Sequence, residues 1–273
     1  MDFSKRIFID GGMGTMLHKK GYRGDTALAN IDAPGLVADI HREYAAAGAD
    51  VITANTFSAY GHKFDNFEAM IRAAVAAARA AGKLVALDMG PTGLLLEPYG
   101  DTPASECAAI FEASAKAGAA CCADLIIIET MMDLAEMELA VKAAKSTGLP
   151  VFATMSFTEK GRTMYGTSIA AMVESLTAHG VDAIGMNCGF GPESYIALAK
   201  ELASLTTLPT ILQPNAGLPE ISGGITTYNV APQSFAATMK EIALAGIGIL
   251  GGCCGTEPAH IQAMRQACEG IGL

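Results

Sequence analysis

The segment "GLVADIHREYAAAGADVITANTF", residues 35–57, contains the unit from which the fold is built. Its first part has apolar residues at helical spacing and ends at Gly48, a residue type that commonly terminates helices. Its second part, "DVITANTF" (50–57), is a short apolar run rich in β-branched residues, which predicts a buried strand. The phrase "AGAD" before this strand has counterparts in "HGVD" (179–182) and "AGIG" (245–248). The helix–strand unit therefore repeats.

Eight apolar runs of this kind occur along the chain. Their nearly continuous hydrophobicity predicts strands that are buried on both faces, as in a parallel sheet. The predicted strands are 6–10, 50–57, 84–90, 125–130, 151–157, 182–188, 209–215 and 246–253. Alanine-rich segments with helical spacing follow them, at 35–48, 67–82, 103–118, 135–148, 169–180, 192–205, 232–246 and 257–270.

This alternation predicts an α/β fold, a single (β/α)8 TIM barrel, with residues 1–273 forming one domain. The length of 273 residues agrees with the roughly 250 residues typical of such barrels. A doubly wound open sheet is the alternative architecture. It usually has fewer units or a second domain, and we find no linker-like stretch in this chain.

Composition narrows the classes of function. The formal net charge is −10 and no basic run occurs, which argues against nucleic acid and anionic membranes as partners. No apolar run approaches the ~18 residues of a membrane span, and the first residues lack a secretory signal. We therefore expect a cytoplasmic protein. In that compartment, 7 cysteines, an odd number, indicate metal binding or catalysis rather than a disulfide framework.

Three of the cysteines follow predicted strands, where the active site of a barrel lies. Cys188 ends the sixth strand, and Cys253 and Cys254 lie side by side in "ILGGCCGTEP" (249–258). Adjacent side chains on a strand point to opposite faces, so the chain must leave strand geometry if both thiols are to face one point. Glycine permits the backbone dihedral angles of such a bend, which explains Gly251, Gly252 and Gly255. The three thiols are then predicted to converge.

Three protein ligands and an open fourth position are typical of a catalytic zinc ion, and thiolates favour zinc or Cu(I). We expect one zinc ion per chain, bound by Cys188, Cys253 and Cys254. A zinc ion with three thiolates is a poor source of hydroxide, and its natural fourth ligand is another thiol. Coordination deprotonates that thiol, whose pKa is ordinarily about 8.5. The site is therefore predicted to activate a substrate thiol for attack on carbon, with no further catalytic residue.

Other interpretations of the cysteine motif remain open at this point. Adjacent cysteines can be small core residues, and glycine-rich loops after the seventh and eighth strands of a barrel often bind phosphate. The absence of a nearby lysine or arginine argues against phosphate. A metal-free barrel lyase or isomerase is a further alternative. The pair Cys121–Cys122 precedes the fourth strand and has no third partner, so we expect it to have a packing role only.

Two carboxylates at strand ends suit the rest of a substrate. Asp10 and Glu129 follow the first and fourth strands and could accept hydrogen bonds from an amino group. Backbone N–H groups of the glycine-rich loop after the first strand could bind a carboxylate. An amino acid that bears a thiol would fit this arrangement. Taken singly, each acid could equally be a helix cap or a structural acceptor.

The motifs at these positions resemble those of the homocysteine S-methyltransferase family over nearly the whole chain. They are most similar to the homocysteine-binding modules of cobalamin-dependent methionine synthases, to which "GRTMYGTS" (161–168) contributes. The motifs are "IDGGMGTML" (9–17), "TANTF" (53–57), "GPTG" (90–93), "IIIET" (126–130), "GMNCGFGPE" (185–193), "PNAGLP" (214–219) and "GGCCGTEPAHI" (251–261).

The resemblance implies a zinc-dependent transferase of methionine biosynthesis in which homocysteine binds the metal through its sulfur. It implies that Cys188, Cys253 and Cys254 are the metal ligands. The implied substrate contacts are Asp10, Gly11, Gly12, Glu129 and Asn215, of which Asn215 is an oxygen ligand or near neighbour of zinc when substrate is absent.

The identity of the methyl donor is open. The sequence ends soon after its last predicted helix, so we expect one half of a methyl-transfer reaction, with cobalamin on a separate protein. A corrinoid protein or methylcobalamin is favoured as donor over S-methylmethionine or betaine. Methylation of another small thiol is an alternative activity. A subunit that only presents a bound thiol to a larger methyltransferase system is a hypothesis of a different class.

Overall fold

A computed structural model describes residues 2–222 and 225–272 of the chain. One sheet of eight parallel strands in these residues has the spatial order β1-β10-β7-β6-β5-β4-β3-β2. A parallel bridge between Ile9 and Val51 joins β1 to β2 and closes the ring. The strands are β1 Ile7–Phe8, β2 Val51–Thr53, β3 Leu84–Met89, β4 Leu125–Met131, β5 Val151–Met155, β6 Ala183–Cys188, β7 Thr210–Pro214 and β10 Ile249–Leu250.

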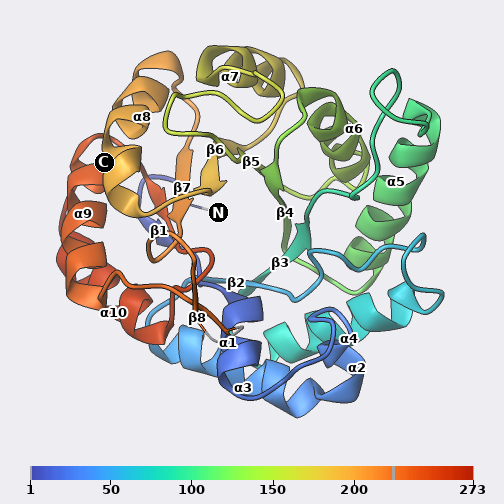
Figure 1. Cartoon of the computed structure of the whole chain (residues 1–273), viewed down its shortest axis with the longest axis horizontal. Helices are drawn as coiled ribbons and strands as arrows, with labels where there is room; N and C mark the ends of the chain where they lie inside the picture. The colour runs from blue at the N-terminus through green and yellow to red at the C-terminus, as the bar shows by residue number, and fades with distance from the viewer. Residues whose placement is uncertain (1, 223–224, 273) are drawn as a thin grey trace.

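Helices surround the strands on all sides, as the view along the barrel axis shows (Figure 1). The predicted (β/α)8 barrel is thereby confirmed. The helices of the outer ring are α3 Pro34–Ala46, α4 Phe67–Arg79, α5 Ala104–Ala120, α6 Leu134–Lys145, α7 Ile169–Ala178, α8 Pro192–Leu205, α9 Pro232–Leu244 and α10 Pro258–Cys268. None of the helices in the described residues is both long enough and apolar enough to cross a bilayer.

Four short elements were not predicted. Helices α1 (Met13–Lys19) and α2 (Ala29–Asp32) lie between β1 and α3, and the antiparallel pair β8 (Glu220–Ser222) and β9 (Ile225–Thr227) lies between β7 and α9. Each has seven residues or fewer, which is shorter than the stretch over which a hydrophobic period is recognised in a sequence. The first and last predicted strands are also much shorter than expected. The range 6–10 contains only the two residues of β1, and 246–253 contains only the two residues of β10.

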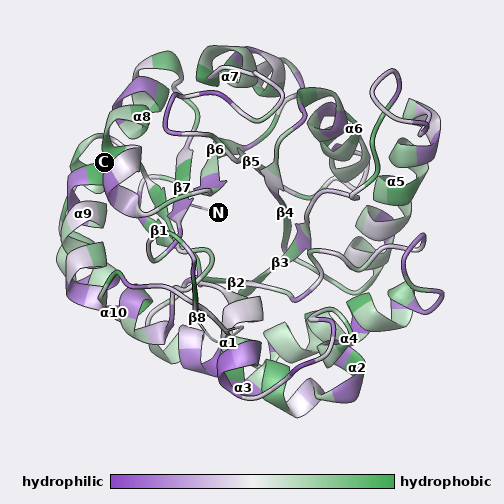
Figure 2. Ribbon diagram, in the orientation of Figure 1, coloured by the Kyte–Doolittle hydropathy of each residue, from purple (hydrophilic) through white to green (hydrophobic). Residues whose placement is uncertain are grey.

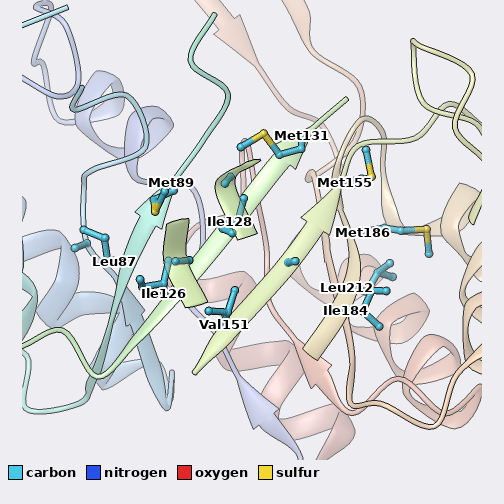
Figure 3. Packing of buried hydrophobic residues seen from close by; sticks show 14 of the residues in the cluster. Leu87, Met89, Ile126, Ile128, Met131, Val151, Met155, Ile184, Met186 and Leu212 are labelled. Carbon is cyan, nitrogen blue, oxygen red and sulfur yellow. The ribbon is translucent and has the colours of Figure 1, made fainter. Parts of the chain in front are cut away.

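The core has two layers because successive side chains of each strand point to opposite faces. One set packs between the strands and the outer helices, and Figure 3 shows part of it, including Leu87, Ile126, Ile128 and Val151. The other set fills the barrel interior and consists of Ile7, Ile9, Val51, Ala86, Leu125, Ile127, Phe152, Ala183, Ile211 and Ile249. Coloured by hydropathy, the strands are mostly hydrophobic, and hydrophilic positions occur mainly on the helices and loops (Figure 2).

The interior becomes polar towards the C-terminal ends of the strands. Two residues beyond the apolar interior positions of β3, β4, β5 and β7 lie Asp88, Glu129, Thr154 and Gln213. Asp88, Thr154 and Gln213 are buried. Asp88, Glu129 and Gln213 of this layer line a pocket at the mouth of the barrel, which is where barrel active sites occur.

Candidate active site

The pocket at the barrel mouth brings together most of the residues selected from the sequence. Strand ends and loops of β1, β2, β3, β4, β6, β7 and β10 contribute to its wall. Seven of the eight predicted site residues line it, namely Asp10, Gly11, Gly12, Glu129, Cys188, Cys253 and Cys254. Asn215 is not among the lining residues.

Asn215 lies behind this wall. It is buried, and its Oδ1 has no hydrogen-bond partner among the described residues. The next residue, Ala216, donates its backbone N–H to the carbonyl oxygen of Cys254 at 2.9 Å, so the two chain segments are adjacent. An unpartnered oxygen beside the cysteine loop is compatible with the role implied for Asn215 and does not by itself establish it.

The Sγ atoms of Cys188, Cys253 and Cys254 all lie within 4.8 Å of one another. Alternation along β6 places Asn187 in the barrel interior and would turn Cys188 towards the outer helices. The backbone of Cys188 instead adopts a left-handed conformation, with φ of 62°, which few non-glycine residues do. This backbone conformation ends the alternation of β6, and Cys188 reaches the pocket.

The glycines beside Cys253 and Cys254 have two different functions. Gly255 has φ of 78°, the left-handed conformation expected for a sharp turn. Gly251 and Gly252 do not have a positive φ, so the expectation that they supply unusual dihedral angles is wrong. They are required for close packing, because a Cβ at Gly252 would lie 2.3 Å from Oγ1 of Thr256 and one at Gly251 would lie 2.9 Å from Cγ of Gln213.

Asn187 connects the cysteines to the rest of the barrel. Its Oδ1 accepts hydrogen bonds from the backbone N–H of Thr130 at 2.7 Å and from Oγ1 of Thr154 at 2.8 Å. Its Nδ2 donates to Oγ1 of Thr130 at 2.7 Å and lies 3.9 Å from Sγ of Cys253. Four elements, β4, β5, β6 and the loop after β10, are thus held together by one fully buried amide.

The three thiols share their protons. Hydrogen bonds from Cys188 and Cys253 lower the pKa of Cys254 to about 3. Hydrogen bonds with Cys188 and Cys254 raise the pKa of Cys253 well above its usual range. These hydrogen bonds favour the thiolate form of Cys254. A soft divalent cation fits this donor set, because it would displace the remaining thiol protons and take sulfur ligands.

Tyr228 lies beside the cysteine cluster and was not selected from the sequence. Its hydroxyl group hydrogen-bonds Cys254, and this contact contributes to the low pKa of that thiol. Its ring lies against Gly255, where an added Cβ would come within 2.2 Å of Cγ of Tyr228. No motif marks this position, because the chain brings it to the site through the loop that contains β8 and β9.

The pocket also contains acidic side chains. Asp10 is 3% exposed and accepts a hydrogen bond from the backbone N–H of Thr53 at 2.9 Å. Burial raises the pKa of Asp10 to about 7. Burial, together with the charge of Cys188, raises the pKa of Glu129 to about 8. No lysine, arginine or histidine is among the described residues that line this pocket, so its acids have no cationic partner from the protein.

In the second cysteine pair, Cys121 packs against the core, whereas Cys122 is exposed, so the expected packing role fits Cys121 only. Cys121 and Cys122 lie between α5 and the start of β4, at the end of the barrel opposite the pocket. Within residues 2–222 and 225–272, the only group of three metal-binding side chains is the one at the barrel mouth.

A parallel barrel with three clustered thiols and three acids at the C-terminal ends of its strands has the layout of a barrel enzyme. Comparison with known families is more specific. The family model for homocysteine S-methyltransferase matches residues 7–268, and the chain belongs to this family. The predicted family and enzyme class are therefore confirmed.

Individual relatives agree with this assignment. Methionine synthase from Mycobacterium tuberculosis is 32% identical over 302 residues, which cover 98% of this chain and 25% of the relative. The chain thus spans about a quarter of the length of such curated relatives. The apo crystal structure of the homocysteine methyltransferase MmuM from Escherichia coli has a TM-score of 0.78 at 26% identity and covers 96% of each chain. The metallated form of MmuM, at 23% identity and a TM-score of 0.81, supports the fold.

Proposed function

We propose that this protein is a zinc-dependent homocysteine S-methyltransferase that forms methionine. The observation that carries the proposal is the pairing, in one pocket, of three clustered thiols with buried acids that lack a cationic partner. A thiol-bearing amino acid has a sulfur that suits the cysteine cluster and an ammonium group that suits the acids.

Cys188, Cys253 and Cys254 would hold the zinc ion, which when bound keeps a substrate thiol in its nucleophilic thiolate form. Asp10 and Glu129 would accept hydrogen bonds from the substrate ammonium group. Gly11 and Gly12 would present their backbone to the substrate carboxylate. A side chain at Gly12 is excluded, since a Cβ there would lie 2.7 Å from the carbonyl oxygen of Cys253.

The reaction then requires little from the protein beyond placement. The substrate sulfur forms a bond to the methyl carbon of the donor, the bond between that carbon and its former partner breaks, and the electron pair leaves with the former partner. The pocket positions the thiolate so that the methyl group approaches from the open barrel mouth. We infer a cytoplasmic location, because thiols stay reduced there and the seven cysteines are all free.

A corrinoid protein or methylcobalamin is the favoured donor, because the curated relatives at about 30% identity are methionine synthases. S-methylmethionine and betaine remain the alternatives, and another small thiol could replace homocysteine as acceptor. In the alternative of a different class, the chain binds the thiol and presents it to a partner that carries out the transfer.

The proposal is tested by zinc analysis followed by titration with homocysteine, monitored by X-ray absorption at the zinc edge. We expect about one zinc ion per chain and an increase from three to four sulfur ligands. Cys188→Ala and Cys254→Ala should lose the metal, whereas Cys121→Ala, the matched control from the other cysteine pair, should retain it. Unchanged zinc content in both site variants would disprove the assignment of the ligands.

The donor is identified by methyl-transfer assays with methylcobalamin, S-methylmethionine and betaine. Turnover with one of them establishes the enzyme and its donor class. Zinc-dependent binding of homocysteine without turnover on any free donor supports the thiol-presenting subunit instead.

A further inference from the structure

Asp88 is a third acid in the pocket, beside the two that would accept hydrogen bonds from the substrate ammonium group. It ends the interior face of β3 and lines the pocket together with Asp10 and Glu129. Its side chain is 6% exposed, and its Oδ1 is buried without a hydrogen-bond partner among the described residues. Buried carboxylate oxygens are nearly always paired, so this orphaned acceptor requires an explanation.

None of the described residues that line the pocket carries a positive charge to pair with Asp88. The hydrogen bonds between Thr56 and Asp88 involve the backbone of Asp88: Oγ1 of Thr56 donates to the carbonyl oxygen at 2.8 Å and accepts from the N–H at 2.9 Å. Burial, Glu129 and Asp10 each raise the pKa of Asp88. Carboxyl groups from β3, β4 and the end of β1 thus line one pocket, and none of the described residues that line it is a lysine, arginine or histidine. A positively charged ligand would neutralise these acids.

We propose that Asp88, Asp10 and Glu129 together form a receptor for the ammonium group of the substrate, and that Asp88 is the member that sets selectivity for it. An ammonium group has three N–H donors, and three carboxyl groups offer one acceptor to each. The substrate class is then the α-amino thiols, and thiol acids without an amino group are rejected. This inference deepens the proposed function and rests on it for the identity of the thiol.

The test compares two ligands that differ only in the amino group, L-homocysteine and 4-mercaptobutanoate, by calorimetric titration of the zinc-loaded protein. Wild-type protein should prefer L-homocysteine. Asp88→Asn should weaken L-homocysteine binding about tenfold to a hundredfold, as expected for a charge-assisted hydrogen bond, and should leave 4-mercaptobutanoate unchanged. Equal weakening of both ligands, or an unchanged preference, would overturn the proposal.

Glu136→Gln is the matched control. Glu136 is also a buried acid, but its Oε1 is paired with the N–H and the hydroxyl group of Thr92 and it does not line the pocket. This variant should lose stability and keep the wild-type preference for L-homocysteine. Asp88→Asn should unfold at the wild-type temperature or above it when free of ligand, because it removes an acid that faces two others.

A second titration separates this inference from the proposed function. L-Methionine and 4-(methylthio)butanoate differ in the same amino group and need no thiolate on a metal. A preference of the metal-free protein for L-methionine that Asp88→Asn reduces supports the ammonium receptor, even if homocysteine adds no sulfur to the metal. If Asp88→Asn keeps the preference for the amino-bearing ligand in both titrations, the role of Asp88 is refuted and the proposed function is unaffected.

Discussion

Asn187 shows how one buried amide can connect distant segments, because it contacts β4, β5 and the loop after β10. It pairs with both polar groups of Thr130, whose φ of 63° is another left-handed conformation at a strand end. It also accepts from Thr154 and contacts Cys253. Removing the amide would leave the buried N–H of Thr130 without an acceptor, and such groups are expensive.

Asn187→Ala should lower the free energy of unfolding by about 2–5 kcal/mol and reduce metal retention. Thr154→Val removes one of the same hydrogen bonds and should cost about 1 kcal/mol with the metal retained. Urea denaturation and metal analysis of both variants provide the measurement. A cost for Asn187→Ala as small as that of Thr154→Val would contradict the connecting role of Asn187.

The buried acids make stability depend on pH. Asp10 and Glu129 have pKa values of about 7 and about 8 in the folded protein, above their ordinary values of 3.8 and 4.5. Between about pH 4 and pH 8 these two acids therefore bind more protons in the folded state than in the unfolded state, and they make the free energy of unfolding of the ligand-free protein fall as the pH rises. The lowered pKa of Cys254 acts in the opposite direction, so the contribution of one acid is measured as the difference between its variant and wild type.

Glu129→Gln should reduce this decrease, because one of the groups with a raised pKa is absent. Denaturation of metal-free protein at pH 5, 7 and 9 measures the effect. Glu112→Gln, which alters an exposed acid paired with Lys116, should retain the wild-type pH dependence. An identical pH dependence in Glu129→Gln and wild type would contradict the assignment.

For individual site residues, the sequence predicted which residue types take part but not how their side chains are arranged. The three cysteines and the two acids could be selected because strand ends are recognisable and the chemistry of thiols is specific. Asp88 and Asn187 were visible at strand ends too, but their roles depend on which face of the strand they occupy and on partners distant in the chain. Tyr228 had no signal at all.

Among the elements, the turn after β10 shows how closely the loops of the mouth interlock. Gly255 has a left-handed backbone and lies against the ring of Tyr228, which the β8–β9 segment contributes. The loop after β1 packs against the same turn, since the N–H of Gly12 donates to Thr256. A change in this turn should therefore affect both neighbouring loops.

Gly255→Ala should lower the free energy of unfolding by about 2–4 kcal/mol, through backbone strain and the clash with Tyr228. In a Tyr228→Ala background the same change should cost only the strain of about 1–2 kcal/mol. A double-mutant cycle by urea denaturation measures the difference. Additive costs would show that the ring and the glycine do not interact.

The long, periodic elements were predictable and the short ones were not. Helix α8 has the predicted bounds, 192–205, because a proline opens it and its apolar face is regular. Helix α1 and the β8–β9 pair are too short to be recognised from a local pattern. Of these unpredicted elements, α1 contributes Met13, Gly14 and Thr15 to the pocket wall.

For the whole molecule, the ring has its fewest backbone hydrogen bonds where the two ends of the chain meet. β1 and β10 are two residues long, and a single bridge joins β1 to β2. β4, on the other side of the ring, pairs over four positions with each neighbour. Local opening should therefore begin at β1 and β10.

Hydrogen exchange monitored by mass spectrometry should show faster exchange in peptides that cover β1 and β10 than in those that cover β4 and β6. Uniform protection around the ring would show that opening is global and would contradict this expectation. The measurement belongs on metal-free protein, in which no bound ion adds to the contacts that hold the two ends together.

The architecture was predictable because eight repeats of one unit in 273 residues leave few alternatives. The sequence could not determine where each strand ends, since strand length in a barrel depends on pairing with both neighbours. Cys188 and the pair Cys253–Cys254 are 65 residues apart, and only the order of strands β6, β7 and β10 makes them neighbours.

Because of that order, an ion bound by the three sulfurs would link β10 to β6. Two of them lie directly after β10, one of the two shortest strands of the ring, and the third ends β6, two strands away. An ion held by all three ties this strand to the well-paired part of the barrel, and it binds only when the ring is shut. Its binding free energy adds to the free energy of closure. If the proposed zinc ion binds here, protein that lacks it would have a barrel that opens more often at β10, in addition to lacking the ion at the proposed active site.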